Sequence, residues 1–339
     1  HMHKPGFNSG RGFDSTVFTR GQEYDPWIVD ETVDVVEAFA AHFKPSPHND
    51  QAEMWGERFR QYLRNITVRP SEEDYCVAQV MNAGIRWLEE RQGRDDLFLW
   101  VDCFDPHEPW DPPAEFKEQY NPGYRGQEII DPVPSQVEGY LTPDEMANIK
   151  ALYAGEITFV DKWIGRLLDA AREMGYFENS MIVFTSDHGE PLDDHGIVRK
   201  HKPWMYEEHA AVPMMIHMPD GAGAGERRQA LAQSCDIAPT ICEAAGVDPQ
   251  PGTHGKSMLP LVRGEVDALR DTALTGIHNQ SWNIRDGRWS FLMAFDRERE
   301  LYDRLADPTE QTNVIAEHPD VASAMELDLR RQVADLRWR

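Results

Sequence analysis

Asp187 and His188 are adjacent residues whose side chains suit a divalent metal ion. They follow the apolar run 181–185 and offer a carboxylate oxygen beside an imidazole nitrogen. Such oxygen and nitrogen donors bind Mg²⁺, Ca²⁺, Mn²⁺ or Zn²⁺. An Asp-His dipeptide also occurs in plain turns, where the aspartate caps the next element. The pair is therefore a candidate metal site that depends on what surrounds it.

A short basic run follows these two residues at positions 199–202. It contains Lys200 and Lys202, and it stands out in a chain whose formal net charge is −25. An ammonium group near a divalent cation stabilises the negative charge that develops on a transferring phosphoryl or sulfuryl group. The alternative is a solvated loop that balances nearby acidic residues. His195 and His201 lie close by in the sequence, and we assign neither of them a role.

His107 is the third candidate for chemistry. It lies between Pro106 and Pro109, whose rings restrict the backbone and so help to fix the direction of the imidazole. A histidine held in this way beside a metal protonates a leaving group or holds an anionic oxygen. The alternative is a histidine that only forms hydrogen bonds within its own loop.

The composition excludes several classes of protein. The 339 residues carry 34 basic and 59 acidic side chains, and this acidic excess argues against binding to nucleic-acid phosphates. With 40% hydrophobic residues the chain has enough apolar material for a folded core. No apolar stretch approaches the roughly 20 residues that cross a bilayer, and the first 30 residues contain no apolar segment typical of a secretory signal. We therefore expect a soluble protein without a membrane partner, with a cytoplasmic location favoured.

Two helices are predicted before the candidate residues. Ser71 is a typical helix N-cap, and the acidic first turn and apolar spacing after it predict a helix that stops at Gly93. Thr142 and Glu145 form a capping box with a proline at the first helical position, and the apolar stripe that follows predicts a helix up to Gly175.

Apolar strands follow each of these helices. The runs 97–101, 181–185 and 212–218 are almost continuously apolar, as expected of strands covered on both faces. A helix that leads into a buried strand is half of a βαβ unit, so we predict an α/β fold with a mainly parallel sheet sandwiched by helices. Because ligands gather at the carboxyl ends of such strands, the loops of His107 and Asp187 are expected to converge.

The last part of the chain has a different character. A short helix is predicted at 236–246 with Asp236 as its cap, and beyond Gly264 the strand-like pieces 273–277, 282–284 and 289–294 predict a small antiparallel sheet. A final helix is expected from about Pro319. We therefore predict an α/β domain at 1–264 and a C-terminal subdomain at 265–339.

Several short motifs follow one another along most of the chain. They are Asp105-Pro106-His107-Glu108-Pro109, Thr185-Ser186-Asp187-His188-Gly189-Glu190, Asp194-His195-Gly196, Tyr206-Glu207-Glu208, Asp236-Ile237-Ala238-Pro239-Thr240, Gly255-Lys256-Ser257-Met258-Leu259-Pro260-Leu261 and Leu301-Tyr302-Asp303. In order and spacing they resemble the sulfatase family of the alkaline phosphatase superfamily. The segment Gly21-Gln22-Glu23-Tyr24-Asp25-Pro26-Trp27 also looks like one that follows the family's first catalytic region.

The resemblance implies roles for the candidate residues. It makes Asp187 and His188 metal ligands, with Ca²⁺ the commonest ion in the family and Mg²⁺ or Mn²⁺ in relatives. It places His107 and one lysine on the anionic group of the substrate, His107 as a proton donor to the leaving oxygen. Spacing from Gly196 favours Lys200, and spacing back from Tyr206 leaves Lys202 open. His1 matches a further histidine that touches the anion.

One family feature is missing from the sequence. The nucleophile of the family is a formylglycine, matured from a cysteine or serine in a Cys/Ser-x-Pro/Ala-x-Arg motif, and no such motif occurs here. Cys76 comes closest but lacks the arginine, and Cys103, Cys235 and Cys242 fail outright; all four are expected to be buried free thiols. The polar, turn-rich opening also reads like the interior of a domain. We therefore expect the nucleophile in a segment that precedes these residues.

The sequence thus predicts a metal-dependent hydrolase of sulfate esters, acting on a small-molecule or saccharide anionic ester. A phosphodiesterase or phosphonate monoester hydrolase on the same scaffold is the alternative enzyme, because phosphate and sulfate esters present similar tetrahedral oxyanions. A non-catalytic fragment that serves as a binding module is the alternative of another class.

Overall fold

The computed structural model describes residues 9–200, 205–277, 280–294 and 297–336. The chain divides into two compact units, 1–176 and 177–339. The predicted boundary at Gly264 falls inside the second unit, between α8, which ends at Val262, and the first strand of the C-terminal sheet. The division into an α/β domain at 1–264 and a C-terminal subdomain at 265–339 stays a prediction.

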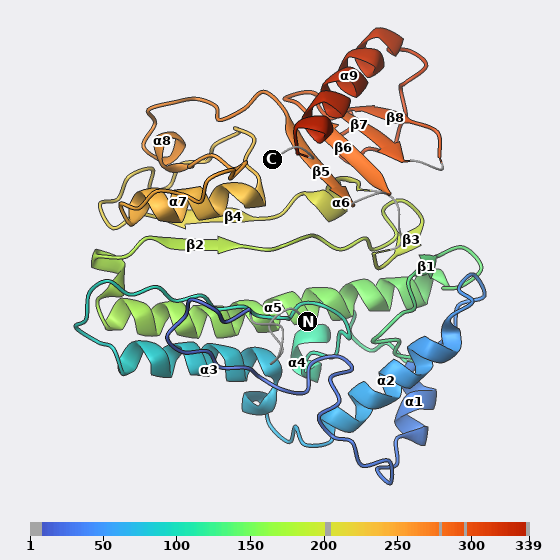
Figure 1. Cartoon of the computed structure of the whole chain (residues 1–339). Coiled ribbons are helices and arrows are strands. Elements are labelled where there is room, and N and C mark those ends of the chain that lie inside the picture. Colours follow the sequence, from blue (N-terminus) through green and yellow to red (C-terminus); the bar gives the residue numbers. More distant parts are fainter. Residues whose placement is uncertain (1–8, 201–204, 278–279, 295–296, 337–339) are drawn as a thin grey trace. The chain divides into compact units, whose positions relative to one another are not determined.

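The first unit is built mainly of helices (Figure 1). Its elements are α1 (Val36–His42), α2 (Ala52–Ile66), a 3-10 turn (Glu72–Asp74), α3 (Cys76–Glu89), α4 (Ala114–Lys117), β1 (Ser135–Gln136) and α5 (Pro143–Glu173).

The longest helix, α5, confirms the capping-box prediction. The Thr142 side chain accepts a hydrogen bond from the Glu145 backbone N–H at 3.2 Å, and the Glu145 carboxylate accepts one from the Thr142 N–H at 2.8 Å. These two bonds satisfy donors that a helix start leaves open. The helix ends at Glu173, just before Gly175, whose φ of +86° suits glycine.

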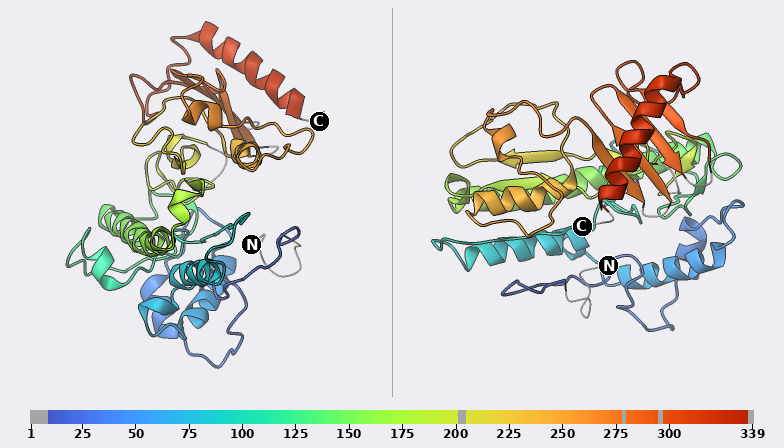
Figure 2. Two further views of the ribbon diagram at one scale, coloured as in Figure 1. Left: turned by 90° about the vertical axis from the view of Figure 1, so that its left-hand side faces the viewer. Right: turned by 45° about the horizontal axis from the view of Figure 1, so that its top comes forward.

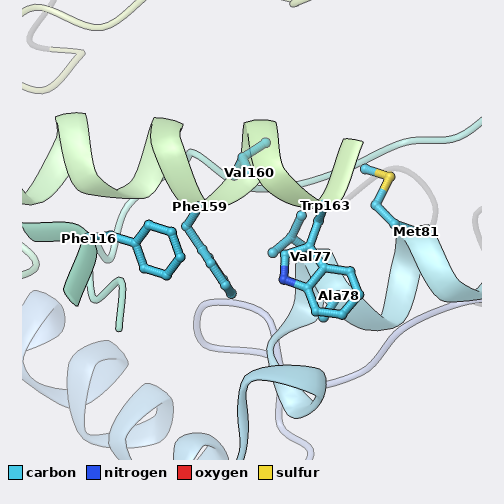
Figure 3. Packing of buried hydrophobic residues seen from close by; sticks show 7 residues of the cluster. All are labelled: Val77, Ala78, Met81, Phe116, Phe159, Val160 and Trp163. Atoms are coloured by element: carbon cyan, nitrogen blue, oxygen red, sulfur yellow. The ribbon is translucent and has the colours of Figure 1, made fainter. Parts of the chain in front are cut away.

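The core of the first unit lies between α3, α4 and α5 (Figure 3). Its buried members are Val77, Ala78, Met81, Phe116, Phe159, Val160 and Trp163. Val77 and Met81 of the stripe predicted for α3, and Val160 of the stripe predicted for α5, lie in this core. Gly155 lets α4 come close to α5, because a Cβ there would lie only 2.9 Å from the backbone nitrogen of Lys117.

The helix predicted after Ser71 is interrupted at its start. Ser71 caps only the short 3-10 turn, and Tyr75 then adopts an extended conformation before α3 begins at Cys76. The α3 N-terminus is capped from elsewhere in the chain, because the Asp105 carboxylate accepts the Val77 N–H at 2.9 Å. The predicted start was therefore early by one turn, and the cap that sets the real start is distant in sequence.

The second unit contains the remaining strands and helices. Its elements are β2 (Ile182–Thr185), β3 (Ile197–Val198), α6 (Glu207–Ala210), β4 (Met214–His217), a 3-10 turn (Ser234–Asp236), α7 (Ile237–Ala244), α8 (Leu259–Val262), β5 (Ala273–Ile277), β6 (Ser281–Arg285), β7 (Trp289–Ala294), β8 (Glu300–Asp303) and α9 (Pro319–Leu336). A further 3-10 turn, Tyr176–Glu178, stands at the junction of the two units.

The C-terminal antiparallel sheet and final helix are confirmed. Strands β5 to β8 pair in sequence order. Helix α9 lies across one face of this sheet (Figures 1 and 2). The shared core consists of Ile284, Phe291, Leu301, Ala322, Met325 and Leu329. The fourth strand of the sheet, β8, was not predicted from the sequence.

The expectation of a mainly parallel sheet is not met by the described residues. β2 and β4 pair with each other in antiparallel register, from Ile182 opposite His217 to Thr185 opposite Met214. The run 97–101 forms no strand, and its residues Phe98 and Trp100 are 51% and 55% exposed. A continuous apolar run indicates a parallel strand only when other elements cover both faces, and the run itself does not reveal its partners.

Two further expectations concern thiols and membranes. All four cysteines are free, as predicted. Cys235 is exposed, so the predicted burial is wrong for this residue, and the other three are only half-buried. Among the helices in the described residues, none combines the length and the apolar character needed to cross a lipid bilayer.

Candidate active site

Asp187 and His188 follow the end of β2 and turn their polar atoms toward each other. His188 Nδ1 lies 2.8 Å from the Gly189 carbonyl oxygen, which can only accept, so Nδ1 carries the proton and Nε2 keeps its lone pair. That Nε2 lies 3.6 Å from Asp187 Oδ2, and the Asp187 side chain is 86% exposed. A nitrogen lone pair and a carboxylate oxygen at this separation fit two ligands of one divalent cation.

The backbone after His188 is fixed by α6. The Gly189 N–H donates to the His209 carbonyl at 2.9 Å, and a Cβ on Gly189 would lie 2.1 Å from the Glu208 carbonyl oxygen. Only glycine therefore fits here. The His209 ring also meets His188 edge-on, with ring centroids 5.5 Å apart. These contacts from α6 hold the two metal-ligand candidates in place.

Lys200 returns to the same loop through a tight hairpin. Leu192 and Val198 form an antiparallel bridge, and Gly196 adopts a φ of +70° in the turn between them. Lys200 Nζ then lies 2.9 Å from an oxygen of Glu190, whose side chain is 6% exposed. The structure thus brings Lys200 beside the residue two positions after His188. Lys202 lies outside the described residues.

His107 belongs to the first unit and is held by its own loop and by a second segment. Its Nδ1 lies 2.7 Å from the Glu108 carbonyl oxygen, which can only accept, so this nitrogen is the donor. The same Nδ1 is 3.5 Å from the Glu108 carboxylate and 3.7 Å from that of Glu23. The peptide bonds that precede Pro106 and Pro109 are both cis. The loop hydrogen bond expected for a structural histidine is present, and the flanking carboxylates were not anticipated from the sequence.

A cavity of about 30 Å³ lies beside His107 and is rich in buried acids. Burial and the Asp111 charge raise the pKa of Asp105 to about 6, against the opposing effect of Arg69. Burial, together with the charges of Asp105 and Asp111, raises the pKa of Glu156 well above its usual value. Arg69 is ion-paired with Asp111. Glu156 Oε2 is buried and forms no hydrogen bond within the described residues.

Cys76 also lines this cavity, at the first position of α3. Burial and the Asp105 charge raise the pKa of its thiol, so the thiol stays protonated at neutral pH. This agrees with the missing nucleophile motif. Among the described residues no group of three or more His, Cys, Asp and Glu side chains is arranged to hold a metal, so Asp187 and His188 supply only two ligands there.

His195 has a structural environment. Its Nδ1 is 2.8 Å from a Glu208 carboxylate oxygen, its Nε2 is 2.8 Å from the Glu310 carbonyl, and its ring stacks on Tyr206 with centroids 3.6 Å apart. Both ring nitrogens are engaged, which leaves no lone pair for a metal. His1 and His201 lie outside the described residues.

Comparison with known proteins decides the family. A family model described as sulfatase matches residues 3–247, well over half of the chain. The chain belongs to the sulfatase family. A second model, N-sulphoglucosamine sulphohydrolase, C-terminal, matches residues 194–338 of this sulfatase-family chain. The resemblance drawn from the motifs is thereby confirmed.

Individual relatives and solved structures agree with this membership. The chain is 28% identical over 260 residues to an arylsulfatase of Clostridium perfringens, an alignment that covers 70% of this chain and 53% of the relative. Its fold matches phosphonate monoester hydrolase of Agrobacterium radiobacter with a TM-score of 0.66 and 24% identity, over 79% of this chain and 62% of the other. It also matches BT4656, solved with its substrate D-glucosamine-2-N,6-O-disulfate, with a TM-score of 0.66 and 20% identity, over 78% and 70% of the two chains.

The chain spans about half the length of the curated relatives it matches, for example 53% of the Clostridium arylsulfatase and 46% of the rat arylsulfatase K. The solved structures have the alkaline phosphatase-like sulfatase fold, and the match shows that this chain has the same fold.

Proposed function

We propose that this chain carries the metal-binding and anion-binding residues of a hydrolase that cleaves sulfate esters. The observation that supports it most is the Asp187–His188 pair. Asp187 Oδ2 and His188 Nε2, the two atoms that would bind the metal, lie 3.6 Å apart, and the proton of His188 is on Nδ1. Family membership supplies the reaction class. The substrate is proposed to be a sulfated small molecule or saccharide, because BT4656, which has the same fold, takes D-glucosamine-2-N,6-O-disulfate as its substrate.

Each residue has a distinct task in this proposal. Asp187 and His188 hold a divalent cation, most often Ca²⁺ in the family, which when bound supplies Lewis-acid stabilisation of the ester oxygens. Lys200 places a positive charge toward the sulfuryl oxygens, where negative charge develops during cleavage. His107 donates a proton from Nε2 to the leaving oxygen. Lys202 stays an alternative to Lys200.

The formylglycine of the family has no fitting residue in this chain. None of the four cysteines and none of the serines lies in a Cys/Ser-x-Pro/Ala-x-Arg motif, and the pKa of the Cys76 thiol is raised by burial. We therefore derive no step through formylglycine.

A phosphonate monoester hydrolase is the second candidate, because the phosphonate monoester hydrolase of Agrobacterium radiobacter has the same fold. Measuring kcat/KM for matched aryl sulfate, aryl phosphate and aryl phosphonate esters distinguishes the two candidates. The proposal predicts the highest kcat/KM for the sulfate. A higher kcat/KM for the phosphonate would replace it by the second candidate.

The proposal is tested by the Asp187→Ala variant of the full protein. We expect sulfate-ester turnover to fall by at least about 100-fold, because a ligand that orients the electrophilic centre is lost. The matched control is Asp267→Ala, which changes an exposed aspartate of the same unit. Wild-type turnover in Asp187→Ala would contradict the assignment. If the wild-type protein hydrolyses none of the three esters, the binding-module alternative is favoured.

A further inference from the structure

Glu23 is a buried acid that the proposed reaction has not yet used. It lies in the segment 21–27, and only 8% of its surface is exposed. Its backbone has a φ of +44°, a left-handed conformation that few residues other than glycine adopt. Such a conformation persists when the surrounding structure holds it in place.

The side chain of Asn65 on α2 supplies that hold. Its Nδ2 group faces three backbone carbonyl oxygens of the turn, those of Gly21 at 3.3 Å, Glu23 at 3.2 Å and Asp25 at 2.8 Å. The Asp25 carboxylate braces the same turn, because it accepts bonds from Arg20 Nε at 2.6 Å and from the Gly21 N–H at 3.0 Å. The turn is therefore held through its backbone by Asn65 and Asp25.

The carboxylate of Glu23 faces His107. Glu23 Oε1 lies 3.7 Å from His107 Nδ1, and Glu108 Oε2 lies 3.5 Å from the same atom. Glu108 is fully buried. Opposite charges within about 4 to 6 Å favour the charged form of a titrating group, and they act more strongly when water is excluded. An imidazolium formed here keeps Nδ1–H on the Glu108 carbonyl and carries a second proton on Nε2.

We propose that Glu23 is a positioning residue that, together with Glu108, keeps His107 in the doubly protonated form from which Nε2 can donate a proton. The catalytic use of that proton rests on the proposed hydrolase function. The electrostatic effect on His107 does not, and it can be measured without substrate or metal.

Other charged groups surround the same cavity, and they set the background against which Glu23 acts. Arg20 pairs with Asp25, and Arg69 pairs with Asp111. Tyr62, Tyr75 and Cys76 stay neutral near pH 7 because burial raises the pKa of each. The remaining acids along the cavity wall are Asp74, Asp105 and Glu156. The described surroundings are thus rich in carboxylates, and those of Glu23 and Glu108 lie 3.7 Å and 3.5 Å from His107 Nδ1.

The test is an NMR titration of the His107 imidazole in the full protein, with the signal assigned by its loss in His107→Asn. In Glu23→Gln the side chain keeps its size and loses its charge, and we expect the titration midpoint to move to lower pH by about 1 unit. Glu53→Gln, an exposed change on α2, is the matched control and should leave the midpoint unchanged. An unchanged midpoint in a folded Glu23→Gln variant would overturn the proposal.

Two further measurements keep the test decisive. If Glu23→Gln does not fold, Glu23→Asp is titrated instead, and its shortened side chain should give a smaller shift in the same direction; no shift there also overturns the proposal. Where the protein hydrolyses sulfate esters, the alkaline limb of the plot of kcat against pH should move with the titration midpoint of His107, while KM stays the same. A shifted midpoint without ester hydrolysis would leave the role of Glu23 standing and contradict only the proposed function.

Discussion

The ammonium nitrogen of Lys200 lies 2.9 Å from a carboxylate oxygen of Glu190, a nearly buried acid two residues after His188. This ion pair ties the end of the hairpin that follows β2 back to its beginning. It gives Lys200 a defined place in the loop that also carries Asp187. Because Glu190 is so little exposed, the charge of its partner matters for the loop as well as for an anionic substrate.

Replacing Lys200 should therefore impair turnover. We expect Lys200→Ala to lower kcat for sulfate esters by about 100-fold, as a positive charge near the developing oxyanion is lost. Lys200→Arg should keep more activity than Lys200→Ala because it retains the charge. Lys150→Ala, an exposed lysine change on α5, serves as the control. Equal activity of Lys200→Ala and the control would shift the role to Lys202.

The buried acid Asp105 predicts a pH-dependent stability. Its pKa rises from 3.8 to about 6, mainly because of burial. Between about pH 4 and pH 6 the folded state holds a proton on Asp105 that the unfolded state releases. The contribution of Asp105 to the free energy of unfolding is therefore fully present below about pH 4 and is lost as pH rises through about 6. Asp105→Asn can still accept the Val77 N–H and should flatten this part of the curve. Urea unfolding between pH 4 and 8 measures it; identical slopes for wild type and variant would refute the prediction.

His195 predicts a second pH effect, in the second unit. Burial opposes its charge, but the hydrogen bonds to Glu208 and to the Glu310 carbonyl raise its pKa above the usual 6.5. The stabilisation is therefore complete below pH 6.5 and is lost as pH rises through the higher folded-state pKa. His195→Gln should lose that extra stability at low pH, whereas the exposed His254→Gln should not. Thermal unfolding at pH 6 and pH 8.5 compares them, and a wild-type difference that persists in His195→Gln would count against this account.

Asp236 forms a buried ion pair with Arg270. It is fully buried, both its oxygens bind Arg270, and it also accepts the backbone N–H groups of Gln233 and Lys256. Burial disfavours its charge, yet the Arg270 and backbone bonds lower its pKa overall. Asp236→Ala leaves a buried guanidinium without its partner and should cost about 3–5 kcal/mol in the free energy of unfolding. Exposed Asp271→Ala is the control, and a loss below 1 kcal/mol, about the size of a surface pair, would be the contrary result.

Local sequence signals predicted several elements well. The capping box of Thr142 placed α5, and the strand-turn-strand pattern on either side of Gly287 placed β6 and β7. Pro319 marked the start of α9. These elements follow from residues close to one another in the chain, so their determinants can be read without tertiary information.

Other features depended on distant residues. The start of α3 is set by Asp105. Asp236 is the N-cap residue of α7, as predicted, but its side chain makes no bond to that helix and instead binds Arg270 and the N–H of Gln233 at the start of the preceding 3-10 turn. The carboxylate of Glu23 near His107 gave no signal by spacing, because Glu23 lies 84 positions before His107 in the chain. Glu108 is adjacent to His107, but the sequence did not show that its carboxylate lies near the ring. The candidate metal ligands were predicted from an adjacent pair, and their described geometry fits that prediction while their function stays a proposal.

The central claim is that Asp187 and His188 together bind a divalent cation. Its most direct test is a calorimetric titration of the metal-free protein with Ca²⁺, comparing the wild type with Asp187→Ala, His188→Ala and the exposed control Asp267→Ala. The account predicts one bound Ca²⁺ in the wild type and the control, and none at the same concentrations in either ligand variant. Undiminished Ca²⁺ binding by both ligand variants would contradict it.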